Sequence, residues 1–204
     1  MIPVSARDVG SVALARMLRD GVLLPLAPRH GMPPDLPESP RQRAACLAPV
    51  VPAHTVVSGL AGLWIRCGGA APSVVDLVGA RGLHRAKPGA DARGWTLVFH
   101  SGGAASGQRE EIGGIVVASA ERCAADALRW RDLGTAIEAV VVAVQAERAD
   151  PAGIGTLVAG DDPRGQGAAR ARSAWGAVST ALGIAPAPGA CDVVRPSAPG
   201  AESP

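Results

Sequence analysis

The sequence contains no tyrosine, a single phenylalanine and a single lysine, and only four cysteines among its 204 residues. Because aromatic side chains are so few, a hydrophobic core must be built mainly from Ala, Val and Leu, with four Trp residues added. The net charge of +2 argues against a strongly basic nucleic-acid-binding protein. Apolar residues make up 48% of the chain and charged residues 19%, which argues against full-length disorder and favours a globular protein.

The sequence also lacks secretory and membrane signals. Its N-terminus has no apolar stretch behind a basic start, so no signal peptide is predicted. The segment 47–65 is uncharged, but two prolines interrupt it, and a membrane span is not expected. No cysteine pair has C-x-x-C spacing, and no cysteine has a histidine at zinc-like spacing. The sequence therefore predicts a cytoplasmic protein with reduced thiols. The cysteines are Cys46, Cys67, Cys123 and Cys191.

Charge is unevenly distributed along the chain. Residues 1–93 carry 11 basic and 6 acidic side chains, a net charge of +5, whereas residues 94–204 carry 9 and 12, a net charge of −3. A surface that faces a polyanion is therefore expected in the first half.

Apolar periodicity and capping residues predict a mostly helical chain with short strands. The first helix is expected from Ser11, a candidate N-cap, to Arg19, followed by an extended segment over 22–26 and a loop over 28–34. Further helices are predicted over 40–48, 58–66, 120–131, 135–148, 151–159 and 168–182. Strands are predicted over 74–78, 95–100 and 115–118, with hairpin-like connections over 79–94 and 101–114.

The apolar stripes of the three strongest helices predict the core. Each stripe recurs at helical spacing, so its members should be largely buried. The predicted core residues are Leu60, Leu63, Trp64, Leu128, Ile137, Val140, Val141 and Val144.

Catalytic and cofactor motifs are not found. The glycine-rich segment 102–107 is followed by Gln108 and Arg109, where a phosphate-binding loop needs Lys and Ser or Thr. Ser58 lies in Val-Val-Ser-Gly-Leu, which is not the Gly-x-Ser-x-Gly of a nucleophile elbow and is explained by helix N-capping. The four histidines are isolated in sequence, and the pair Glu110–Glu111 is expected in a solvated loop. The sequence therefore predicts no enzyme activity, no metal and no cofactor.

Contact with DNA is the one function for which the residues give a positive signal. The segment from Ser11 to residue 26 is predicted as helix, turn and strand, the order of a recognition helix followed by a wing. Arg16 and Arg19 lie three residues apart on one helix face, and Arg29 lies in the wing. Three phosphate contacts would give a log–log salt slope of about −2.7. The alternative interpretation is that these arginines form an ordinary solvated helix face.

The order of four segments resembles the AbiEi-type antitoxin family of type IV toxin–antitoxin systems, especially an actinobacterial branch. They match the end of the family's winged helix–turn–helix, the helix that opens its second domain, a strand-to-helix step, and an Arg/Ala-rich helix. The segments are Ala15–Leu23, Val56–Trp64, Gly114–Asp126 and Gly165–Ala177. This chain departs from the family in having only ten residues before the recognition helix and no run of arginines in the wing.

The resemblance implies an α+β protein: a reduced winged helix–turn–helix remnant, then a small α/β domain with a short sheet and a helical C-terminal half. The expected boundaries are 1–36 for the remnant, 37–184 for the antitoxin-like domain and 185–204 for a disordered, proline-rich tail. Such a protein would bind its own promoter DNA through Ser11, Arg16, Arg19 and Arg29 and counter a nucleotidyltransferase-like toxin through its second domain. A similar module precedes very-short-patch-repair-like endonuclease domains. The alternative is therefore a non-catalytic interaction module left from a nuclease-associated protein without its endonuclease domain.

The absence of metal-ligand, phosphate-loop and nucleophile patterns predicts that the pure protein does not cleave DNA. We expect plasmid DNA to remain supercoiled after incubation with the protein and Mg²⁺ or Mn²⁺, as judged by gel electrophoresis. Metal-dependent cleavage that a single point substitution abolishes would contradict this prediction.

Overall fold

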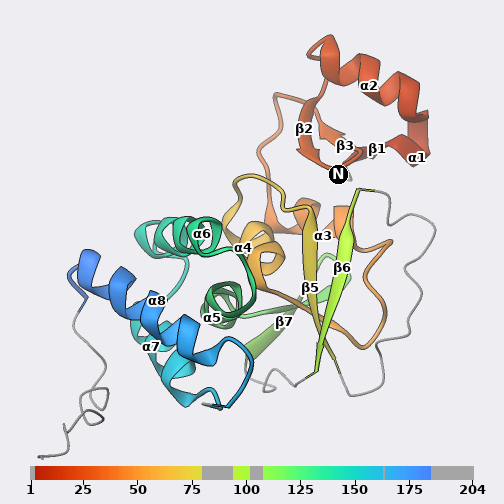
Figure 1. The fold of residues 1–204 in the computed structure, drawn as a ribbon. Helices are drawn as coiled ribbons and strands as arrows, with labels where there is room; N and C mark the ends of the chain where they lie inside the picture. The colour runs from red at the N-terminus through yellow and green to blue at the C-terminus, as the bar shows by residue number, and fades with distance from the viewer. Residues whose placement is uncertain (1–2, 80–93, 102–107, 163, 185–204) are drawn as a thin grey trace, which may run out of the picture.

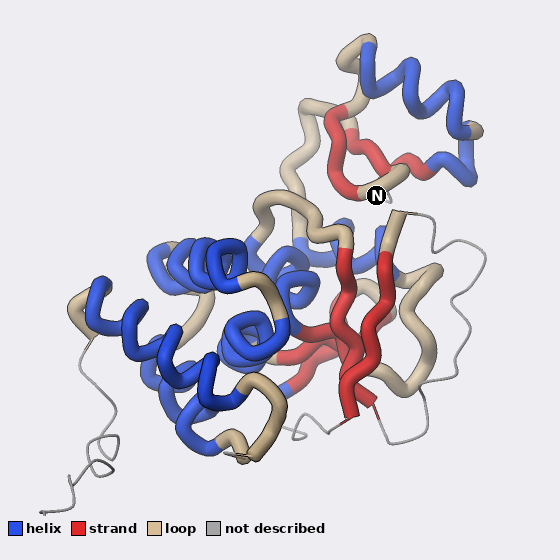
Figure 2. Tube along the Cα trace, in the orientation of Figure 1, coloured by secondary structure: helices blue, strands red, loops and turns tan. Residues whose placement is uncertain are grey.

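The protein has a mixed α+β fold with two small sheets. The computed structural model describes residues 3–79, 94–101, 108–162 and 164–184, and these residues form eight helices and eight strands. Figure 1 shows a small N-terminal unit beside a larger body, in which helices pack against a sheet. Figure 2 shows that helices joined by loops, without strands, make up the C-terminal part of the described chain. The predicted tail over 185–204 lies outside the described residues.

The N-terminal unit contains one three-stranded sheet and two helices. Its elements are β1 (Val4–Ser5), α1 (Ala6–Val9), α2 (Ser11–Arg19), β2 (Leu24–Ala27) and β3 (His30–Met32). The sheet is antiparallel and its order is β1-β3-β2. The predicted helix over residues 11–19 is confirmed, but its N-cap is Gly10, so the expectation that Ser11 caps it is wrong.

Strand β3 replaces part of the loop expected over 28–34. Gly31 lies at its centre, where it pairs with Val4 on one side and Pro25 on the other. A Cβ at this position would lie 3.0 Å from the Leu23 Cβ, so the close packing of the unit favours glycine here. Such a short strand with a central glycine has little β-propensity of its own, and sequence patterns do not reveal it.

The N-terminal unit shares a hydrophobic core with the larger body. Its own small core contains Leu14 of α2 and Leu23, both buried. Leu26 of β2 and Met32 of β3 instead belong to the large core cluster that also contains Trp95. The β2–β3 hairpin therefore holds the N-terminal unit against the body.

The larger sheet is mixed and has the order β6-β5-β4-β8-β7. Its strands are β4 (Val56–Ser58), β5 (Val74–Gly79), β6 (Thr96–Ser101), β7 (Arg109–Ile112) and β8 (Ile115–Ala118). Strands β5 and β6 run parallel, and β6 and β7 lie at opposite edges, so the hairpin-like connections expected over 79–94 and 101–114 are wrong. The pair Glu110–Glu111 lies in edge strand β7 rather than in a loop, although both side chains are exposed.

Six helices belong to the body: α3 (Pro40–Leu47), α4 (Gly59–Cys67), α5 (Ala120–Trp130), α6 (Leu133–Gln145), α7 (Pro151–Gly160) and α8 (Ala168–Ala181). All six were predicted within a few residues of these bounds. Ser39 accepts a hydrogen bond from the Gln42 backbone N–H, and Ser119 accepts one from Arg122, as their capping roles require. No helix of the described chain has the length and apolar character that a bilayer crossing requires.

Helix α5 is the centre of the helical half and packs against α4, α6, α7 and α8. Its buried side chains are mostly alanines, which allow neighbouring helices to approach closely. At the contact with α4, Gly62 faces Cys123, and a Cβ at position 62 would overlap the Cys123 sulfur. The scarcity of large aromatic residues is thus matched by close helix packing around α5.

The predicted core is confirmed in part. Leu63, Trp64, Leu128 and Val140 are buried. The remaining four, which are Leu60, Ile137, Val141 and Val144, are half-buried. The buried stripe of α6 consists of Ala136, Val140 and Ala143, so the helix is rotated slightly from the expected register.

The contact between α4 and α5 predicts a compensating pair of substitutions. Gly62→Ala should lower the free energy of unfolding by about 1–3 kcal/mol, because the new methyl group overlaps the Cys123 sulfur. Adding Cys123→Ala should restore a large part of that loss. Urea denaturation of the two single variants and the double variant measures the coupling. Additive effects of the two substitutions would contradict the proposed contact.

Candidate functional site

Helix α2 presents a mixed apolar and basic face to solvent. Val12, Arg16 and Arg19 are spaced i, i+4, i+7, so they lie on one side of the helix, opposite the buried Leu14. Val12 is 83% exposed, and the side chains of Arg16 and Arg19 are 76% and 72% exposed. Ser11, at the start of the same helix, is also exposed. The fold therefore brings three of the four predicted DNA-contacting residues together on one element.

The positive charge of this face is partly offset. The Nε atoms of Arg16 and Arg19 lie 3.5 and 3.0 Å from the two carboxylate oxygens of Asp20. Exposed ion pairs of this kind are weak and are readily exchanged for contacts with another anion. The two guanidinium groups are held near each other by the same carboxylate.

Arg29, the fourth predicted DNA-contacting residue, does not lie on α2. It occupies the turn between β2 and β3 with a left-handed φ of 62°, and its carbonyl oxygen accepts a hydrogen bond from the Ala6 N–H at 3.0 Å. The residue lines a cavity of about 310 Å³ together with Val50 and Trp95 of the body. The fold thus places Arg29 at the junction of the two parts of the molecule.

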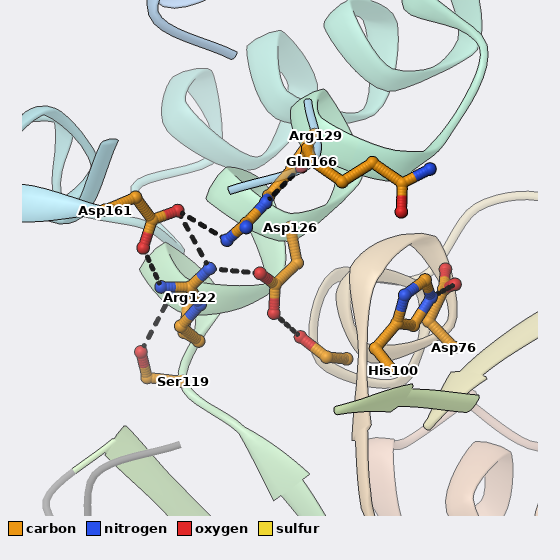
Figure 3. Close-up of polar contacts among 9 residues, drawn as sticks. Asp76, His100, Ser119, Arg122, Asp126, Arg129, Asp161 and Gln166 are labelled. Carbon is orange, nitrogen blue, oxygen red and sulfur yellow. Dashed lines mark hydrogen bonds and ion pairs between the residues drawn. The ribbon is translucent and has the colours of Figure 1, made fainter. Parts of the chain in front are cut away.

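A buried carboxylate organises the edge of the larger sheet. Asp76 on β5 is fully buried, and Arg131, just after α5, binds both of its oxygens, with Nε 2.7 Å from Oδ2. His100 Nε2 on β6 donates to Asp76 Oδ1 over 2.7 Å, and the His100 ring stacks on Trp130 with 3.6 Å between centroids. Figure 3 shows His100 and Asp76 directly facing each other.

A second polar chain begins on the neighbouring strand. Ser58 of β4, which is opposite Asp76 in the sheet, donates to Asp126 Oδ2 over 2.6 Å. Asp126 also pairs with Arg122, which binds Asp161 Oδ1 with Nη1 at 2.9 Å (Figure 3). Burial lowers the pKa of Arg122, but hydrogen bonds to both carboxylates outweigh this effect and hold its pKa above the ordinary value.

These networks are structural in character. Ser58 is fully buried and its hydroxyl is used by Asp126, so it does not resemble an exposed nucleophile. Ser58 is the N-cap residue of α4 as predicted, but its hydroxyl makes no capping hydrogen bond and serves Asp126 instead. Burial raises the pKa of the Cys46 thiol to about 12 and raises that of Cys123 as well, so neither thiol is an activated nucleophile.

Sequence reasoning missed both networks because their partners are far apart along the chain. His100 is isolated in the sequence, whereas in the structure Asp76 faces it from the adjacent parallel strand. The available signal was the acidic residue in the otherwise apolar segment Val74–Val78, because a carboxylate in a central strand requires a buried partner.

Comparison of the chain with protein-family models, with curated proteins and with solved structures found no match. The described residues contain no group of three or more His, Cys, Asp or Glu side chains that could hold a metal ion.

The burial of Asp76 predicts a large effect on stability. Asp76→Ala should lower the free energy of unfolding by about 3–5 kcal/mol, because Arg131 and His100 would lose their shared carboxylate. Glu111→Ala, which removes an exposed carboxylate from edge strand β7, is the matched control and should change stability by about 0.5 kcal/mol or less. Similar denaturation midpoints for the two variants would show that the Asp76 cluster does not stabilise the fold.

Proposed function

We propose that this protein is a cytoplasmic, non-enzymatic regulator of the antitoxin type that binds promoter DNA through α2 and a partner protein through its larger body. The observation that carries the DNA-binding part is the exposed face of α2, on which Val12, Arg16 and Arg19 lie together. Arginines of a docked helix bind phosphates, and a small apolar side chain suits the methyl group of thymine.

The arrangement around α2 supports this proposal. The order β1-α1-α2-β2-β3, with β3 between the other two strands, is what a winged helix without its first helix would have. In such folds the second helix of the helix–turn–helix enters the major groove and a β-hairpin follows it. Here α1 and α2 are separated by Gly10, and the β2–β3 hairpin follows α2.

Binding by a single copy should be weak. Two phosphate contacts from α2 would release few counterions and give a log–log salt slope of about −1.8. Asp20 also offsets part of the charge of the two arginines. Useful affinity at physiological salt would therefore need a second copy or a bound partner.

The proposal that the body binds a partner rests on the family resemblance, which implies a nucleotidyltransferase-like toxin. One local feature supports it. A cavity of about 300 Å³ between α4 and α6 is lined by Leu60, Trp64 and the exposed Val142. This apolar cavity gives a partner side chain a place to dock.

The alternative function is a non-catalytic interaction module without DNA binding. The observation that favours it is the pairing of both α2 arginines with Asp20, because exposed arginines that pair within their own helix are typical of an ordinary solvated surface. A toxin gene beside this gene would support the antitoxin proposal, and a nuclease reading frame downstream would support the alternative.

DNA binding is tested by a mobility-shift titration of the full chain on DNA from upstream of its own gene at two salt concentrations. The Arg16→Ala/Arg19→Ala variant should bind more weakly and should lose about 1.8 from the magnitude of the salt slope. Arg29→Ala is measured separately, because that residue lies at the junction cavity.

The matched control is Arg41→Ala/Arg109→Ala. It removes the same two charges from exposed positions on α3 and β7, and it should retain the wild-type salt slope. Equal affinity of the wild type and the α2 variant would remove the support for a DNA-binding regulator and leave the interaction module.

A further inference from the structure

A basic pocket lies where β6, the C-terminal end of α5 and the start of α8 meet. Its volume is about 620 Å³, within the range of small-molecule sites. The side chains that give the pocket its character are basic, amide or aromatic, and no carboxylate among the described residues lines it. They are His100, Arg129, Trp130, Arg131, Gln166 and Arg170.

Positive charge exceeds negative charge around this pocket. Four arginines and three carboxylates form the surrounding network. They are Arg122, Arg129, Arg131, Arg170, Asp76, Asp126 and Asp161. The excess cation is Arg170, which forms no ion pair with a carboxylate within the described residues and whose Nη2 donates instead to the Arg129 carbonyl oxygen. An anion bound in the pocket would balance the positive charge of Arg170.

The cationic groups are fixed in place before any ligand arrives. Arg131 is held through both oxygens of Asp76, and His100 is held by the same carboxylate. Arg129 donates from Nε to the Gln166 carbonyl oxygen, and its Nη1 lies 3.2 Å from Asp161 (Figure 3). Side chains that are already ordered lose little entropy on binding, which favours affinity.

The start of α8 adds to the positive potential of the pocket. Its N-cap, Gly167, has a left-handed φ of 76° and no side chain to cap the helix, and the first turn contains no acidic residue. A Cβ at this position would overlap the Arg129 carbonyl oxygen, so the close approach of α8 to the end of α5 depends on glycine. The helix dipole therefore reinforces the arginines.

We propose that this pocket binds an organic phosphate monoester. Guanidinium groups arranged around a cavity suit the several oxygens of a phosphate, which can accept from more than one arginine at once. The pocket is larger than a phosphate group alone requires, and Trp130 with Phe99 supplies a wall for an organic portion. The site is on the body, away from α2, and does not depend on the proposed DNA binding.

The test is isothermal titration calorimetry of the full chain at constant ionic strength, with chloride as the balancing anion. The probes are inorganic phosphate, adenosine monophosphate, adenosine, and a short oligonucleotide with or without a 5′-phosphate. We expect saturable binding of the phosphate-bearing probes and none of adenosine. The comparison between the mononucleotide and the 5′-phosphorylated oligonucleotide distinguishes a free metabolite from a nucleic-acid end.

Variants of α8 assign the binding to the pocket. Arg170→Gln should weaken phosphate binding about tenfold, because it removes a charge-assisted hydrogen bond, and Arg170→Lys should retain most of the affinity. Arg172→Gln is the matched control: it lies two positions along α8 on a different face, does not line the pocket, and should bind normally. The thermal midpoint of each variant without ligand establishes that it folds.

Two results would overturn the proposal. One is the absence of saturable binding of every phosphate-bearing probe to the wild type. The other is equal weakening by Arg170→Gln and Arg172→Gln, which would show that phosphate responds only to the overall charge of α8. Arg170 would then serve only to bind the carbonyl end of α5.

Discussion

The fold depends on one carboxylate that is buried among apolar strands. A buried carboxylate without partners would be costly in the sheet, and Arg131 and His100 provide the partners of Asp76 from the end of α5 and from β6. The requirement therefore constrains the residues at positions 76, 100 and 131 together. It also explains Gly59, whose φ is +59° and at which a Cβ would lie 2.5 Å from Asp76 Oδ2. Asp76 thus connects β5 to β6 and to the end of α5. The edge of the sheet and the basic pocket beside it therefore depend on the same carboxylate.

A core with few aromatic residues has consequences for the rest of the molecule. Small side chains bury little apolar area each, so the helices must pack closely to exclude water. Helix α5 meets this need with buried alanines and with Gly62 opposite Cys123. The polar chain of Arg122, Asp126 and Asp161 then connects α5 to the C-terminal end of α7. Close packing and buried ion pairs thus act together in the helical half.

The helices were predictable from the sequence because their signals are local. Ser39 and Ser119 cap helices within three residues, and the Asp150-Pro151 pair begins α7 where it was expected. Strand pairing was not predictable, since neither the short β3 nor the parallel pairing of β5 with β6 has a local signature. The candidate site on α2 could be named from helical spacing. The basic pocket could not, because His100, Arg131 and Arg170 are brought together only by the tertiary fold.

The shared core of the two parts of the molecule determines the geometry of any assembly. Since Leu26 and Met32 are embedded with residues of the body, α2 cannot pivot on a loose tether, and its direction is set by the larger sheet. If two copies associate through their bodies, the separation of their α2 helices is therefore a fixed length. A fixed separation selects operators whose half-sites have the matching number of base pairs between them. Under the proposed DNA-binding function, the β2–β3 hairpin would then determine the spacing of the bound half-sites, because it fixes α2 against the body.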